Sequence, residues 1–348
     1  MRASLILTLL LSASLSAESR LGATDGVAAI RLHRSGVDVR WENKVGRALS
    51  ELAILSVARE HDQPYEWSLH EMEAIAVGLD PAAIDVVRNR KPLVGIGDKE
   101  TTIIQLARDI GGHRVRAETY SRALTTFSEA ILVDIVSLMG QYAATATRLS
   151  AVNQQLPPGW KQFLPLPFTP PADIRADSRS RLTLIRTAAS AAAMPPPLYS
   201  RGMAPEGTGP QQIARHAGGL QSLQASVGRP LIDVAALVTA RAHDQQYDWT
   251  MTEIAAQKDG VSAATIDVIR SGKPTTGLGE KEATVIEFGR ELFGKHYVSA
   301  DVYARALRQF GERDLVDLVG VMAQHADEAA VLTAFDQQLP AGQKALLP

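Results

Sequence analysis

Residues 46–70 read GRALSELAILSVAREHDQPYEWSLH, and residues 228–252 read GRPLIDVAALVTARAHDQQYDWTMT. The similarity continues without a gap, so that residues 46–112 align on residues 228–294 at an offset of 182, with 30 of 67 positions identical. One inserted residue then changes the offset to 183, and the match resumes toward the end of each segment. This degree of self-similarity indicates that the chain contains two tandem copies of one structural unit.

Apolar residues recur at helical spacing throughout the first copy, and turn-forming residues separate the periodic segments. Gly78 is a C-terminal cap, while Asp80 and Pro81 are an N-cap followed by proline at the first helical position. The expected helices cover residues 49–60, 65–77, a segment starting at 81, and 98–111, 117–127 and 129–152. No segment alternates with the period of a β-strand, so the sequence predicts an all-α protein whose last, most apolar helix is central or oligomeric.

A proline-rich stretch separates the two copies. Prolines between residues 157 and 171 favour an extended connector, because proline does not continue a helix. The predicted units are a first copy (18–165), a linker (166–180) and a second copy (181–348). Within the second unit we expect a helix over residues 181–192 and a loop over residues 203–210.

The first seventeen residues are typical of a secretory signal. Arg2 precedes an apolar run over residues 5–11, and small residues follow over 14–17. The run is too short to span a bilayer. We therefore expect residues 1–17 to be removed and the protein to be periplasmic or secreted, without membrane contact after cleavage. The alternative is an N-terminal helix that stays attached.

The composition narrows the classes of function. The 348 residues are 45% hydrophobic and 21% charged, which is typical of a globular protein. A net charge of −2 argues against a nucleic-acid partner, since such proteins carry a basic excess. The chain has no cysteine, so disulfide bonds and thiol chemistry are excluded.

One acid–histidine cluster in the first copy is a candidate for chemistry. Glu66 and His70 are four residues apart and lie on one face of a helix. A carboxylate raises the basicity of a neighbouring imidazole, so such a pair moves protons to and from a substrate. Glu51 on the preceding helix joins them if the two helices form a hairpin, and Tyr65 and Trp67 flank the pair. The alternative interpretation is a solvated ion pair beside two core aromatic residues.

The segment Glu51–Arg59, followed by Tyr65–His70, resembles the signature of the carboxymuconolactone decarboxylase family, as do Gly78–Leu79 and Gly140–Tyr142. The resemblance implies an alkyl hydroperoxidase D-like bundle of about six helices that forms homo-oligomers. Two fused copies would then form a pseudo-dimer.

The same resemblance implies cofactor-free acid–base chemistry on a small carboxylated or lactone-like metabolite. His70 would be the acid and base, and Glu51 and Glu66 would orient it or relay protons. The aromatic residues expected to contact the substrate are Tyr65, Trp67 and Tyr142. A non-catalytic oligomeric scaffold or ligand binder is the alternative.

Peroxidase chemistry, known from the wider family, is disfavoured. Gln63 and Glu66 stand where that branch has its two cysteines. No metal site is expected either. His61 and His243, each followed by aspartate, lack the three or four convergent ligands of a metal site, and a helix-terminal role explains them.

The second copy departs from the site pattern at four positions. The residues that replace Glu51, Glu66, His70 and Tyr142 are Asp233, Asp248, Thr252 and His325. Because the histidine of the helix is lost, the second copy is interpreted as a structural partner with a degenerate site.

Overall fold

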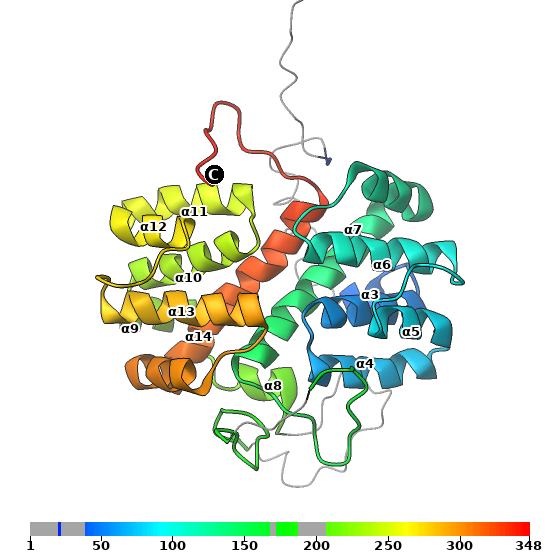
Figure 1. Cartoon of the computed structure of the whole chain (residues 1–348), viewed down its shortest axis with the longest axis horizontal. Helices are drawn as coiled ribbons and strands as arrows, with labels where there is room; N and C mark the ends of the chain where they lie inside the picture. Colours follow the sequence, from blue (N-terminus) through cyan, green and yellow to red (C-terminus); the bar gives the residue numbers. More distant parts are fainter. Residues whose placement is uncertain (1–19, 22–38, 168–171, 187–206) are drawn as a thin grey trace, which may run out of the picture.

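The computed structural model describes residues 20–21, 39–167, 172–186 and 207–348, and Figure 1 shows their arrangement. All regular secondary structure within these residues is α-helical, which confirms the predicted all-α class. The predicted signal segment, 1–17, lies outside the described residues. Its removal and the periplasmic or secreted location stay predictions.

The helices form two sets with the same order. The first set comprises α2 (Val39–Glu42), α3 (Arg47–Glu60), α4 (Pro64–Ala76), α5 (Pro81–Arg88), α6 (Asp98–Gly111) and α7 (Ala117–Ala151). The second set comprises α8 (Gly209–Ala214), α9 (Leu220–Val227), α10 (Arg229–Ala242), α11 (Gln246–Lys258), α12 (Ala263–Arg270), α13 (Glu280–Lys295) and α14 (Ala300–Ala334). Each helix from α3 to α7 therefore has a counterpart, from α10 to α14, at the position that the sequence repeat gives it.

Repeated local signals explain why the hairpins α3–α4 and α10–α11 form. Asp62 and Asp244 both adopt φ 46°, the left-handed conformation that aspartate tolerates in tight turns. The side chain of Gln63 then accepts a hydrogen bond from the Tyr65 amide, and Gln245 does the same at the start of α11. These caps satisfy amides that a helix start leaves without a partner, so α4 and α11 each begin directly after the turn that ends the preceding helix.

The two long helices α7 and α14 cross at the centre of the molecule, with the smaller helices of each copy on either side (Figure 1). Leu132, Leu138 and Met139 of α7 join Leu332 and Phe335 in one hydrophobic cluster. The composition and length of α7 would also suit a membrane span, but half of its most apolar window is buried inside the molecule. The first copy therefore shares its hydrophobic cluster with the end of α14, while most of the second copy's buried residues form a separate cluster.

The helix α7 is broken at Ser128, where the predicted boundary between two helices falls. Ser128 adopts φ 63° and ψ 163°, a region that is populated almost only by glycine. Its counterpart in α14 is Gly311, with φ 70° and ψ 172°. The break is therefore a repeated feature of the fold. Only the second copy has glycine there, the residue type that this backbone conformation favours.

We expect Ser128→Gly to raise the free energy of unfolding by about 1 kcal/mol, because glycine removes the steric cost of this conformation. Ser128 is exposed, so little packing is lost. Urea denaturation measures the change. The matched variant Gly311→Ser should lower the stability by a similar amount, and a destabilising Ser128→Gly variant would contradict the interpretation.

Two predictions in the connection between the copies are wrong. Residues 181–186 are not helical, and the remainder of the expected helix, 187–192, lies outside the described residues. Arg181 is held in place instead, since its amide donates to Val152 and its guanidinium donates to the carbonyl of Val298 at 2.7 Å. The loop expected over 203–210 ends early, because α8 begins at Gly209; residues 203–206 are not described.

Candidate functional site

The acid–histidine cluster of the first copy is real, but its pairing differs from the expected one. His70 on α4 donates through Nδ1 to Glu51 Oε2 on α3 at 2.7 Å. The residues are 3% and 0% exposed, so the alternative of a solvated ion pair is wrong. Burial alone would raise the pKa of Glu51, yet His70 and two arginines bring it to about 2. Burial lowers the pKa of His70 despite the carboxylate, so the pair is a neutral imidazole with an anionic acid.

Glu66 lies in the same region without bonding to His70. Neither of its carboxylate oxygens has a hydrogen-bond partner among the described residues, and only 2% of the residue is exposed. Burial raises the pKa of Glu66 well above its usual range, so the site favours the neutral carboxylic acid more than water does. The expected pair of Glu66 with His70 does not form because His70 turns across the hairpin to Glu51 instead.

A cation from outside the repeat fills the first-copy site. The guanidinium of Arg40, on α2, lies 3.2 Å from Glu51 and also forms an ion pair with Glu73. Arg47 adds a second, more exposed guanidinium at 3.1 Å from Glu51 and 3.4 Å from Glu73. Two guanidinium groups therefore balance two carboxylates in a buried space, and Arg40, 7% exposed, closes it.

The three predicted substrate-contacting aromatic residues are not brought together. Tyr142 adjoins the site, with its ring centroid 4.9 Å from that of His70 in an edge-on arrangement. The hydroxyl of Tyr65 is instead 2.9 Å from that of Thr208, and its ring stacks on Trp160. Trp67 is fully buried and donates to Glu71. Tyr65 and Trp67 therefore serve packing in the structure.

The second copy also contains an acid–imidazole pair, built from different positions. His325 on α14 lies with Nδ1 2.9 and 3.0 Å from the two carboxylate oxygens of Asp248 on α11. Thr252, which stands where the first copy has His70, donates to the same carboxylate at 3.3 Å. The imidazole has moved from the short helix to the long one, and its partner has moved from the Glu51 position to the Glu66 position.

This second pair faces an open cavity of about 450 Å³, which we call the acidic chamber. Its ionisable lining residues are Arg229, Asp233, Asp248, His325 and Glu328. Leu220, Tyr247 and Thr252 also line it. A cavity of this size accommodates a small metabolite. The first-copy site, in contrast, holds its own arginine.

Both copies place two carboxylates and one imidazole close enough to surround a single cation. The ligand-type atoms of Glu51, His70 and Glu73 lie within 4.8 Å of one another, and so do those of Asp248, His325 and Glu328. Such groups are ligands for divalent metals as well as partners for organic cations. In the first copy that cation is the guanidinium of Arg40.

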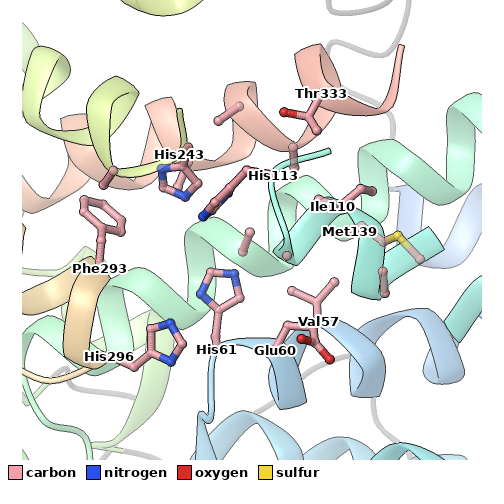
Figure 2. A pocket seen from close by; sticks show the side chains of 17 residues that line it. Val57, Glu60, His61, Ile110, His113, Met139, His243, Phe293, His296 and Thr333 are labelled. Carbon is pink, nitrogen blue, oxygen red and sulfur yellow. The ribbon is translucent and has the colours of Figure 1, made fainter. Parts of the chain in front are cut away.

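A second cavity, of about 120 Å³, lies where the two copies meet, and we call it the imidazole cavity (Figure 2). His61 of the first copy faces His296 of the second with ring centroids 5.7 Å apart, and His113 faces His243 at 5.3 Å. The repeat relates the two pairs, because His61 matches His243 at the first offset and His113 matches His296 at the second. The helix-terminal position expected for His61 and His243 is confirmed, since they are the C-caps of α3 and α10.

No protein-family model, curated protein or solved structure matches this chain. The sequence pointed to the neighbourhood of Glu51, His70 and Tyr142, which the structure places together, but it indicated neither Arg40 nor the contact of His325 with Asp248. Arg40 lies outside the duplicated segment, so comparison of the two copies could not single it out. The replacement of Tyr142 by histidine was visible, but only the fold shows that it lies beside the acid at position 248.

Proposed function

We propose that the protein is an enzyme that carries out cofactor-free acid–base chemistry on a small molecule in the acidic chamber. The observation that carries this proposal is the pair of His325 and Asp248 on the wall of an open cavity. The carboxylate of Asp248 lies beside Nδ1 of His325 and raises the basicity of the imidazole, which then takes a proton from a ligand. Asp248 then stabilises the imidazolium that forms, and the proton returns in the second half of the reaction.

The lining of the chamber restricts the ligand. Among the described residues that line it, three are acidic and one is an arginine, so a ligand carboxylate would meet net repulsion from these side chains. An uncharged lactone-like or a cationic molecule suits the chamber better than a carboxylated one. The resemblance to the carboxymuconolactone decarboxylase family supports proton transfer as the reaction class but not its carboxylated substrate.

The enclosed first copy supports a second candidate function, a ligand-binding scaffold without catalysis. Arg40 occupies the place of a substrate beside Glu51, and this copy then contributes stability to the shared core. On this reading the two copies have separate roles, and the assembly of the chain into homo-oligomers stays a prediction.

The test compares turnover of a panel of small lactones, lactone acids and amine-bearing esters by the wild type, His325→Ala and His70→Ala. We expect His325→Ala to lose about 100-fold or more in kcat/KM, the typical contribution of a general base. His70→Ala should change activity less than about threefold, since its site is closed by Arg40. Equal losses in both variants would contradict the assignment of the reaction to the acidic chamber, and no turnover by the wild type would favour the scaffold.

A further inference from the structure

The imidazole cavity gathers four histidines that lie far apart in the sequence. His61, His113, His243 and His296 all line it, and Figure 2 shows their rings around one space. Each ring contact joins a histidine of the first copy to one of the second. The local spacings around His61 and His243 could not reveal this group, because the copies must pack together to form it.

The ends of four helices make this cavity favourable for a cation. His61, His243 and His296 are the C-caps of α3, α10 and α13, and His113 directly follows the C-cap of α6. The C-terminal end of a helix carries a partial negative charge, so four such ends together favour positive charge. Glu60, which also lines the cavity, acts in the same direction when it is ionised.

The spacing of the rings suits a shared metal ion. Two imidazoles that bind one ion through metal–nitrogen bonds of about 2.0–2.1 Å have ring centroids about 5–6 Å apart. The centroids of His113 and His243 are 5.3 Å apart, and those of His61 and His296 are 5.7 Å apart. Both pairs therefore have the separation of two ligands on one ion.

His243 is also oriented as a ligand. Its Nδ1 lies 2.9 Å from the carbonyl oxygen of Thr239. A carbonyl only accepts hydrogen bonds, so Nδ1 carries the proton and the neutral ring has its lone pair on Nε2. Histidines that bind metals commonly donate their other nitrogen to a backbone carbonyl in this way. Burial lowers the pKa of His243 to about 4 and also lowers that of His113, so protons compete little with a metal ion at pH 7.

We propose that the imidazole cavity binds one late transition-metal ion, of the Zn²⁺ or Cu²⁺ class, through His113 of the first copy and His243 of the second. Imidazole favours these ions over Mg²⁺ and Ca²⁺, which prefer oxygen ligands. His113 is exposed and provides a route of entry. The volume of about 120 Å³ leaves room for water molecules that complete the coordination of the ion. This site is separate from the acidic chamber and goes beyond the proposed function.

The acidic clusters could also bind metal ions, so the test must count imidazole ligands. The clusters Glu51–His70–Glu73 and Asp248–His325–Glu328 each contain a single imidazole. Electron paramagnetic resonance of the full chain with one equivalent of Cu²⁺ resolves hyperfine coupling to each bound imidazole nitrogen. We expect coupling to two nitrogens in the wild type, unchanged by an excess of Mg²⁺.

His113→Asn removes one proposed ligand with little risk to the fold. His113 adopts φ 60°, a conformation that asparagine tolerates well. This variant should lose the two-nitrogen spectrum and bind Cu²⁺ at least about tenfold more weakly in calorimetry, since even the loss of a supporting contact around a metal costs about 10–100-fold. His61→Asn is the matched control within the same cavity, and it should keep the two-nitrogen spectrum.

Zn²⁺ gives a second, independent readout. An ion that binds only the folded chain raises the urea midpoint, so Zn²⁺ should stabilise the wild type and His61→Asn more than His113→Asn. Coupling to a single nitrogen in the wild type would overturn the proposal in favour of an acidic cluster. An unchanged spectrum in His113→Asn, or its loss in His61→Asn, would contradict the assignment to His113 and His243.

Discussion

Replacing Arg40 with alanine should lower the free energy of unfolding by about 3 kcal/mol at pH 7. The guanidinium is 7% exposed and forms ion pairs with Glu51 and Glu73, which are 0% and 3% exposed. Removal of one partner from a buried ion pair leaves uncompensated charge, which typically costs about 3–5 kcal/mol. Arg47 still pairs with both carboxylates in the variant, so we expect a loss near the lower end of this range.

A double-mutant cycle separates the charge from the packing of this side chain. Adding Glu73→Gln to Arg40→Ala should recover about half of the lost stability in urea denaturation, because the two changes act on one contact. Millimolar methylguanidinium should also raise the midpoint of Arg40→Ala more than that of the wild type, because only the variant lacks the guanidinium between Glu51 and Glu73. Arg122, whose pair with Asp98 is exposed, is the control, and Arg122→Ala should cost less than about 1 kcal/mol. A similar loss in both arginine variants would refute a buried site.

The imidazole cavity should make the protein sensitive to acid. Burial lowers the pKa of His61 to about 3 and that of His243 to about 4. The unfolded chain therefore binds protons at higher pH than the folded chain, and stability falls as the pH drops below about 6.5. Both rings are half-buried, which reduces the expected loss to roughly 1–2 kcal/mol for each by pH 5. His113 and His296 add in the same direction, since burial also lowers their pKa values.

The measurement compares the wild type with the double variant His61→Asn/His243→Asn in urea denaturation at pH 7 and pH 5. Glu66, with its raised pKa, changes stability in the opposite direction, so only the difference between the two proteins is informative. The free energy of unfolding of the wild type minus that of the variant should be lower at pH 5 than at pH 7 by roughly 2–4 kcal/mol. Parallel pH profiles would show that the histidines are solvated.

The helices were predictable because repetition doubled each local signal. Gln63 and Gln245 cap equivalent helices, and Ser128 and Gly311 break equivalent long helices, so each pattern occurs twice in one chain. The segment that begins at residue 181 was not predictable, because its conformation follows from contacts of Arg181 with Val298, which is 117 residues away.

The site was only partly predictable for the same physical reason. The i and i+4 spacing of Glu66 and His70 is a property of one helix, whereas the bond between His70 and Glu51 depends on how two helices pack. His325 contacts Asp248 because α14 packs against α11, and spacing along the chain does not reveal this contact. The arginine that closes the first copy lies before the repeat begins.

The shared core of α7 and α14 joins two units of common origin within a single polypeptide. In an assembly of identical chains, every substitution appears at all equivalent sites at once, so a change that opens one pocket opens them all. A chain that carries both units is free of that constraint. One unit here keeps its imidazole on α4 beside an internal arginine, while the other carries it on α14 beside an open chamber. Duplication within one gene thus allows one half to specialise while its twin preserves the scaffold.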